Sequence, residues 1–168
     1  RVEQAYNRQG QVKQTRDQNG TLHQYDYDLL GRQTDDRVTF LGSGIDGAVR
    51  RIGRTYEVHG LPLTVTSYDA ASGGAVVNQI QYDYNSFQQV TLEYQSHAGS
   101  VNTWTTPKVG YAYANGSANT IRPEKLIYPN GRTIEWAYVE DDDSLSRVTE
   151  LRDRISPSMA TPLVAYAY

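Results

Sequence analysis

Apolar and polar side chains alternate along short segments of this chain with a period of two residues. Alternation of this kind places every second residue on one face of a β-strand, so each segment predicts a strand with one buried face. No window of a dozen residues carries a helical apolar stripe, and Pro123 interrupts the best helical candidate, residues 122–127. The pattern therefore predicts an all-β fold. The alternating sets are Leu61, Leu63 and Val65; Val76, Ile80, Tyr82 and Tyr84; Val90, Leu92 and Tyr94; Val109, Tyr111 and Tyr113; and Ile134, Trp136 and Tyr138.

A tyrosine recurs along the chain at intervals of 21 to 30 residues, each time close to a turn-forming segment. A period of this length indicates a repeat protein. In several units a second aromatic residue stands two positions earlier, so that both rings lie on the same face of a strand. The recurring residues are Tyr6, Tyr27, Tyr56, Tyr84, Tyr113, Tyr138 and Tyr168, and the earlier aromatics are Tyr25, Tyr82, Tyr111, Trp136 and Tyr166.

Turn signals separate the predicted strands. Gly10, Gly31 and Gly60 follow the first three recurring tyrosines at the same spacing. Asn-Gly between alternating apolar residues predicts a type I′ hairpin turn, whose two central residues both need φ > 0. Two units depart from the pattern, because Phe87-Gln88 follows Tyr84 and an acidic run follows Tyr138, and we expect a longer turn or another turn type there. The remaining signals are Gly31-Arg32, Gly73-Gly74, Asn115-Gly116 and Pro129-Asn130-Gly131-Arg132.

Each unit holds about two strands, which favours consecutive antiparallel hairpins over a sandwich or a four-stranded propeller blade. A Val-x-x-x-Arg-Asp frame occurs twice, beginning at Val12 and at Val148, and we expect it on the return strand of a hairpin. We therefore predict that residues 1–168 form a single segment of tandem hairpin repeats. Because the sequence begins inside one unit and stops on Tyr166-Ala167-Tyr168, we expect it to be a piece of a longer array.

Composition narrows the functional classes. Apolar residues make up 38% of the chain, and it contains 14 tyrosines against two phenylalanines and two tryptophans. Tyrosine buries a ring but keeps a hydroxyl that needs a hydrogen-bond partner, which suits a thin sheet whose side chains are partly exposed to water. The net charge is −3 and the pI is about 5.6, so the chain lacks the excess of Lys and Arg that is typical of nucleic-acid-binding proteins. The chain has no cysteine, and its apolar runs are too short to span a bilayer.

Three segments carry a resemblance to a known family: Tyr25-Asp26-Tyr27-Asp28-Leu29-Leu30-Gly31-Arg32, Tyr82-Asp83-Tyr84-Asn85, and Tyr128-Pro129-Asn130-Gly131-Arg132 through Trp136-Ala137-Tyr138. They resemble the YD repeats of the Rhs family, which includes bacterial Rhs proteins, the C component of bacterial toxin complexes and the animal teneurins. The Y-D-x-x-G-R pattern followed by a β-branched strand is fairly specific, and its copies cover nearly the whole chain.

The resemblance implies a structural function. In that family the repeats form a β-sheet that spirals into a hollow shell around a C-terminal segment, which is often a toxin, and the proteins are secreted or lie at the cell surface. It implies flanking repeats of the same chain and an enclosed polypeptide as partners, a bacterial origin, no cofactor and no enzymatic activity. The D-P-x-G-L element near the family's self-cleavage site is missing, since Asp153-Arg154-Ile155-Ser156-Pro157 does not match it. The implied structural positions are Tyr6, Gly10, Tyr25, Tyr27, Gly31, Arg32, Tyr56, Gly60, Tyr82, Tyr84, Tyr111, Tyr113, Tyr128, Gly131, Arg132, Trp136, Tyr138, Tyr166 and Tyr168.

Two other functional classes stay open. The first is an extracellular module whose sheet face binds carbohydrate or protein, since aromatic rings can stack on sugars. The second is an enzyme of the glycosidase type, built on carboxylates that lie beside aromatic residues. The recurrence of these acids in register with the tyrosines favours a structural role instead. The acids in question are Asp26, Asp28, Asp83 and Glu135.

Metal and phosphate chemistry have weaker signals. His23, His59 and His97 fall in three different units without ligand spacing. The run Asp141-Asp142-Asp143 offers oxygen ligands for Ca²⁺ but lacks the alternating spacing of a calcium loop. The glycine-rich segment 41–47 lacks the Lys-Ser/Thr end of a phosphate loop, so we expect a connection between strands. The sequence predicts no catalytic, cofactor or metal residue.

Overall fold

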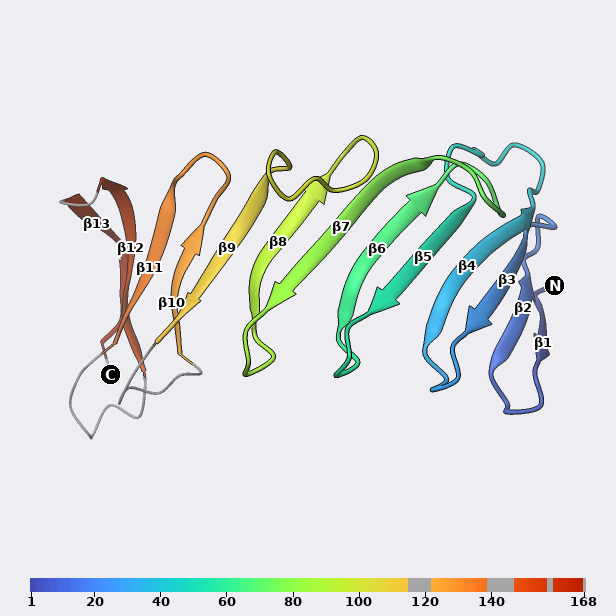
Figure 1. Ribbon diagram of the computed structural model, residues 1–168, viewed down its shortest axis with the longest axis horizontal. Coiled ribbons are helices and arrows are strands. Elements are labelled where there is room, and N and C mark those ends of the chain that lie inside the picture. Colours follow the sequence, from blue (N-terminus) through green and yellow to red (C-terminus); the bar gives the residue numbers. More distant parts are fainter. Residues whose placement is uncertain (115–121, 139–146, 157–158, 168) are drawn as a thin grey trace. The chain divides into compact units, whose positions relative to one another are not determined.

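The structure is a computed structural model that describes residues 1–114, 122–138, 147–156 and 159–167. Every regular element in these ranges is a β-strand (Figure 1), which confirms the all-β prediction. The strands are β1 (Glu3–Tyr6), β2 (Val12–Arg16), β3 (Leu22–Tyr27), β4 (Gln33–Phe40), β5 (Arg51–Tyr56), β6 (Pro62–Tyr68), β7 (Val76–Tyr84), β8 (Val90–Ser96), β9 (Lys108–Tyr113), β10 (Pro123–Ile127), β11 (Thr133–Tyr138), β12 (Val148–Ser156) and β13 (Met159–Ala165).

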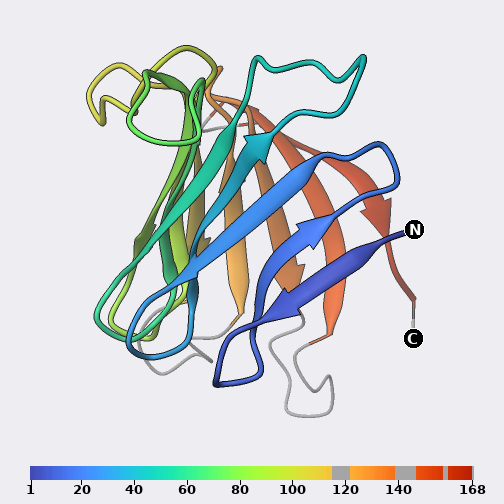
Figure 2. The same ribbon diagram turned by 90° about the vertical axis from the view of Figure 1, so that its right-hand side faces the viewer.

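The strands follow one another across a single sheet in chain order, from β1 to β13. Neighbouring strands pair antiparallel, so the sheet is a succession of hairpins, as the sequence predicts. By compactness the chain divides into unit 1, residues 1–82 with 94–106, and unit 2, residues 83–93 with 107–168. In unit 1 the short turns after β1, β3 and β5 lie at one edge of the strands, the lower edge in Figures 1 and 2. The longer connections after β4 and β6 lie at the opposite edge.

The short turns share one backbone design. In the first of them Gly10 N donates to Asn7 O, and Asn7 N donates to Gln11 O. The fourth residue has a left-handed backbone, and the strand register shifts beside the turn, between Ala5 and Tyr6. This is a type I turn followed by a bulge residue, which closes a hairpin with the twist that antiparallel strands need. The left-handed residues, with φ between +64° and +95°, are Gly10, Gly20, Gly31, Gly60, Gln88 and Gly131.

Two turn predictions need correction. The type I′ turn predicted at Asn130-Gly131 is wrong, because Gly131 has φ +84° whereas Asn130 has no positive φ. Pro129 fixes φ near the value of the second residue of a type I turn, so the turn begins one residue earlier, at Tyr128. The different turn predicted after Tyr84 is also wrong, since Gln88 takes the glycine position with φ +64° and the same two backbone hydrogen bonds form.

Other predicted turns are placed as follows. Gly73 and Gly74, with φ of +62° and +82°, lie in the connection between β6 and β7. The Val-x-x-x-Arg-Asp frames begin on β2 and β12, each the return strand of a hairpin. The Asn115-Gly116 turn, the acidic run with Asp141–Asp143 and Tyr168 lie outside the described residues.

The two faces of unit 1 differ in chemistry. Strand register places Tyr25, Ile52, Val65 and Ile80 on one side, here called the tyrosine face, which also carries Asp36 opposite Tyr25 and Arg54 opposite Val65. The other side, the polar face, carries charged and hydroxyl groups: Asp26, Asp35, Arg37, Arg51, Thr64, Thr66 and Gln79. Polar side chains there pair with one another, as in the 2.6 Å ion pair of Arg37 with Asp26.

Unit 2 has the same division between its faces. Its tyrosine face carries Tyr111, Leu126, Ile134, Trp136 and Leu151, which strand register brings into line, together with Asp153 opposite Ile134. On its polar face Glu135 forms ion pairs with Lys125 at 3.5 Å and Arg154 at 3.0 Å.

Little of the described chain is deeply buried. Tyr94, at 3% exposed, and Ala114, at 8%, are its buried apolar residues, and Thr21 and Thr66 are its buried polar ones. Most strand residues are half-buried on both faces. A single sheet layer can cover a side chain only with its lateral neighbours, which explains why tyrosine, with one apolar and one polar end, predominates.

We predict that Gln88→Gly stabilises the protein by about 0.5–1 kcal/mol, because a side chain in the left-handed region is strained and glycine removes that strain. Gln18→Gly is the matched control, since Gln18 lies in an equivalent turn without a positive φ and glycine there should destabilise slightly. Urea unfolding followed by circular dichroism measures both. Equal losses for the two variants would contradict the strained backbone at Gln88.

Candidate functional site

The recurring tyrosines occupy one structural position. Each is the final residue of an odd-numbered strand, and the connection to the next strand begins directly after it. In the strands that have a second aromatic residue two positions earlier, alternation places that residue on the same face of the sheet as the recurring tyrosine. The residues at this position are Tyr6 in β1, Tyr27 in β3, Tyr56 in β5, Tyr84 in β7, Tyr113 in β9 and Tyr138 in β11.

In unit 1 two of these hydroxyls reach back to the preceding hairpin. The Tyr27 hydroxyl donates a hydrogen bond of 2.7 Å to the backbone oxygen of Val12, the first residue of β2. The Tyr56 hydroxyl donates one of 2.7 Å to the backbone oxygen of Gln33, the first residue of β4. Each bond therefore joins the end of one hairpin's first strand to the start of the previous hairpin's second strand.

Unit 2 repeats this contact with the same positions. The Tyr113 hydroxyl donates to the backbone oxygen of Val90, the first residue of β8, at 2.9 Å. The Tyr138 hydroxyl donates to the backbone oxygen of Pro123, the first residue of β10, at 2.8 Å. We call this repeated contact the tyrosine clasp, and its recurrence shows that the tyrosine period serves the joining of consecutive hairpins.

The clasp uses both ends of the side chain. The ring lies half-buried on the tyrosine face, while the hydroxyl satisfies a carbonyl at the beginning of a strand. Burial raises the pKa of Tyr113, and it likewise raises the pKa of Tyr138 against the opposing effect of Arg122. A neutral, donating hydroxyl is thereby favoured at both positions. A hydrogen bond of this type contributes about 0.5–1.5 kcal/mol.

Tyr6 holds the same position without a clasp. It ends β1, the first strand, and its side chain is 57% exposed. Its hydroxyl donates to Oε1 of Gln4 at 2.8 Å, on the same strand. Tyr6 therefore has the geometry of a clasp residue on the outer edge of β1.

Asp28 organises the turn that follows Tyr27. Its Oδ1 accepts hydrogen bonds from the backbone nitrogens of Leu30 and Arg32, both at 2.9 Å, and its Oδ2 lies 2.7 Å from Nε of Arg32. Partial desolvation acts to raise the pKa of Asp28, but these hydrogen bonds and the charge of Arg32 outweigh it, so the pKa is lowered. Asp28 is thus held as the carboxylate that closes the turn.

Arg32 connects this turn to the next hairpin. Its guanidinium lies over the ring of Tyr56, 4.4 Å from the centroid, in a cation–π contact. The same Arg32 is paired with Asp28, and Tyr56 is itself a clasp residue. These contacts give a physical role to each specified residue of Y-D-x-x-G-R. The Tyr forms the clasp, the Asp caps the turn, the Gly takes the left-handed bulge position, and the Arg stacks on the next tyrosine.

Other turns use amides in place of charges. Asn7 Oδ1 accepts hydrogen bonds from Gln9 N and Gln11 N, and Asn7 Nδ2 donates to Oε1 of Gln11 at 2.7 Å. Asn85 and Gln89 repeat this pair in the later turn, again at 2.7 Å. Asp28 therefore pairs with the arginine four residues later, and in two other turns an Asn pairs with the Gln at that spacing. The sequence analysis missed this matching, although the residue types at that spacing are visible in the sequence.

The remaining predicted positions have different surroundings. The ring of Tyr25 stacks on His23 with centroids 6.2 Å apart. The Tyr111 hydroxyl donates to Glu93 at 3.3 Å. Tyr128 and Arg132 begin and end the turn between β10 and β11, on the strand edge opposite to the clasps of unit 2, with Gly131 between them. Tyr82 lies within β7, Trp136 within β11, and Tyr166 just after β13.

The residues weighed for catalysis or metal binding have ordinary partners. His23 lies 2.7 Å from Asp36, and His59 lies 2.7 Å from Glu57. Asp26, Asp28 and Glu135 each face an arginine in an ion pair. Within the described ranges, no three His, Asp or Glu side chains converge as a metal site requires.

The glycine-rich segment 41–47 connects β4 to β5 and runs close to the turn after β2. Gly42 N donates to Oγ1 of Thr21 at 3.2 Å, and Asn19 Nδ2 donates to the oxygen of Ser43 at 2.8 Å. A side chain at Gly42 would meet Asn19 O at 2.6 Å, so glycine is needed for this approach. The segment thus packs against the neighbouring turn.

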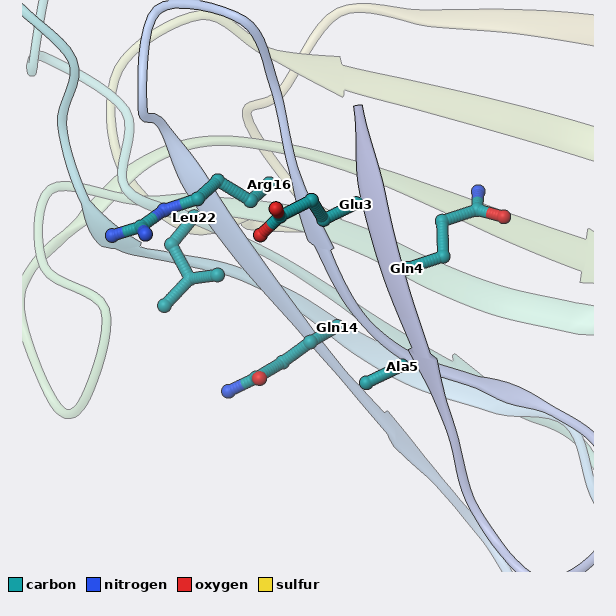
Figure 3. Close-up of a pocket in the computed structure, with 6 residues that line it drawn as sticks. All are labelled: Glu3, Gln4, Ala5, Gln14, Arg16 and Leu22. Carbon is teal, nitrogen blue, oxygen red and sulfur yellow. The ribbon is translucent and has the colours of Figure 1, made fainter. Parts of the chain in front are cut away.

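An open depression of about 360 Å³ lies on the polar face at the edge of unit 1 (Figure 3). Residues of β1, β2 and β3 line it: Glu3, Gln4, Ala5, Gln14, Arg16 and Leu22. In Figure 3 the side chain of Gln4 points away from those of the other five. No described segment forms a helix long and apolar enough to cross a membrane.

Comparison with known proteins gives matches among solved structures. Neither the protein families nor the curated proteins give a match. The chain is similar to part of the crystal structure of TcdB2-TccC3-Cdc42, with 13% identity and a TM-score of 0.44 over 96% of this chain and 9% of the other. It is also similar to part of TcdB2-TccC3-TEV, with 14% identity and a TM-score of 0.40 over the same shares. The chain therefore spans about a tenth of the matched chains.

We predict that Tyr27→Phe lowers the free energy of unfolding by about 1 kcal/mol, because it removes the clasp donor and leaves the half-buried Val12 carbonyl without it. Tyr25→Phe is the control: it lies on the same strand and face, and no described residue accepts a hydrogen bond from its hydroxyl. Urea unfolding of both variants measures the difference. Equal effects of the two substitutions would show that the Tyr27 hydroxyl does not join the hairpins.

We predict that the stability advantage of Asp28 over an asparagine at the same position decreases on acidification. The folded pKa of Asp28 is lowered, so its contribution is complete above the unfolded value, about 4, and is lost as the pH falls through the folded pKa. An asparagine there keeps the turn cap, as Asn7 does in its own turn, but does not titrate. Unfolding of wild type and Asp28→Asn at pH 7 and pH 3 tests this, and an unchanged difference would contradict it.

Proposed function

We propose that this chain is a structural module: part of the wall of a hollow β-shell that encloses a C-terminal polypeptide of the same protein, such as a toxin. The observation that carries the proposal is the tyrosine clasp, repeated at four hairpin junctions with the same donor and acceptor positions. A contact repeated in this way serves the continuation of a sheet, whereas a catalytic site is normally a single constellation. The resemblance to YD repeats gives the same interpretation.

The edge of the sheet supports the idea of flanking repeats as partners. Tyr6 is exposed at the clasp position, and in the described sheet β1 pairs only with β2, which leaves its other side available to a preceding hairpin. A carbonyl at the start of that hairpin's return strand would replace Gln4 as the acceptor of the Tyr6 hydroxyl. On this proposal the parent protein is a larger bacterial protein, secreted or at the cell surface, and this module has no enzymatic activity.

The two faces have properties suited to a wall. The tyrosine face carries the clasps, and the polar face carries ion pairs and hydroxyl groups that remain half-exposed. A polar, hydrated surface gives an unfolded segment few apolar contacts on which to collapse. The polar face is therefore our candidate for the side that faces an enclosed polypeptide.

We predict that, in the longer protein containing this chain, the C-terminal segment resists a protease and loses that resistance in the double variant Tyr27→Phe with Tyr56→Phe. Removal of two adjacent clasps should open the wall by weakening the junctions between hairpins. Limited proteolysis with mass spectrometry measures the cleavage rate, and Tyr25→Phe is the control that should stay resistant. Rapid cleavage of the segment in the intact wild-type protein would overturn the enclosure.

A further inference from the structure

Trp104 is the more exposed of the two tryptophans in the chain. It lies in the connection between β8 and β9, and its side chain is 94% exposed. Figure 1 shows this connection beyond the strand ends, at the edge opposite to the short turns of unit 1. Leaving an indole in water forgoes the burial of a large apolar surface, and nothing in the turn requires an aromatic residue at this place.

The backbone around Trp104 is fixed before any ligand arrives. Asn102 closes the turn from both ends: its Oδ1 accepts from Trp104 N at 3.0 Å, and its backbone oxygen accepts from Thr106 N at 2.8 Å. Asn102 N in turn donates to Oγ1 of Thr106 at 2.9 Å. A ligand that meets the indole therefore loses little free energy in ordering the loop.

The same loop is also anchored to the sheet. Val101 N donates to Oε1 of Gln79 at 2.8 Å, and Gly99 N donates to the backbone oxygen of Val77 at 2.9 Å. Both acceptors belong to β7, so the strand fixes the position from which Trp104 projects.

The segment that carries the indole is polar and uncharged from Ala98 to Thr106. Residues 98–106 contain no Asp, Glu, Lys, Arg or His. Thr103 and Thr105, on either side of Trp104, are exposed, as is Asn102. The loop therefore offers one aromatic face with hydroxyl and amide groups beside it.

We propose that the Trp104 loop is a binding site for a neutral carbohydrate. One face of a pyranose ring presents a small patch of C–H groups, which match the negative face of an indole, and its hydroxyls pair with neutral donors and acceptors. A protein-binding anchor is usually surrounded by other apolar residues, which this loop lacks, since Val101 is half-buried. Attraction to an anionic membrane needs Lys or Arg, which are also missing from the loop.

The proposed site differs from the sheet-face binding considered from the sequence, and it does not depend on the shell. It would lie on the connection between β8 and β9, with a single aromatic platform. Such a platform covers one side of a sugar, so the expected Kd is in the millimolar range, at the weak end of specific binding.

The test uses the full 168-residue chain carrying Trp136→Phe, so that Trp104 is its one tryptophan. Neutral oligosaccharides of glucose, galactose, mannose and N-acetylglucosamine are titrated separately while the tryptophan emission is recorded. We expect a saturable change with at least one of them. In the wild-type chain, saturation-transfer NMR with that sugar should lose its signal on Trp104→Ala and keep part of it on Trp104→Phe.

The matched control is Phe87→Ala, which removes another exposed aromatic residue, 64% exposed, from a different turn and should leave binding unchanged. Circular dichroism establishes that each variant keeps the β-sheet signal. The proposal is overturned if none of these oligosaccharides gives a saturable change, or if the NMR signal survives Trp104→Ala. It is also overturned if phosphatidylcholine vesicles shift the emission and the sugars do not, because the loop would then bind a lipid surface.

Discussion

The hydrogen bond from a tyrosine hydroxyl to a carbonyl of the preceding hairpin is the interaction on which this structure depends. A single sheet layer has no second layer to cover it, and the described residues include very few that are deeply buried. Strand pairing alone leaves each hairpin free to move relative to its neighbour at the strand ends. The clasp contributes at that place: Tyr27 and Tyr56 in unit 1, and Tyr113 and Tyr138 in unit 2, each add a bond where the ladder stops.

Much of this fold follows from the sequence because its signals are local. Alternation gives the strands, and the tyrosine period gives the hairpins. The clasp was not predictable, because its acceptors are backbone oxygens, and the residues that carry them include Val, Gln and Pro. The turn type at Asn130 was misjudged because Pro129 determines where that turn begins.

Gln88 shows a different limit of sequence reasoning. Its turn keeps the glycine-type geometry because Asn85 accepts two backbone hydrogen bonds, from Phe87 and Gln89, and pairs with the Gln89 side chain. These contacts outweigh the strain of a left-handed glutamine. The absence of glycine therefore does not exclude this turn where an Asn at its first residue pairs with a Gln at its fifth.

Because a clasp joins a hairpin only to the one before it, duplication or deletion of a whole unit leaves all other junctions intact. A gene encoding such a sheet can therefore change its length by recombination between copies, without a compensating mutation elsewhere. Divergence is then limited mainly by the tyrosine hydroxyl and the turn cap. The other exposed positions are free to drift, which accounts for units that differ widely in sequence within one chain.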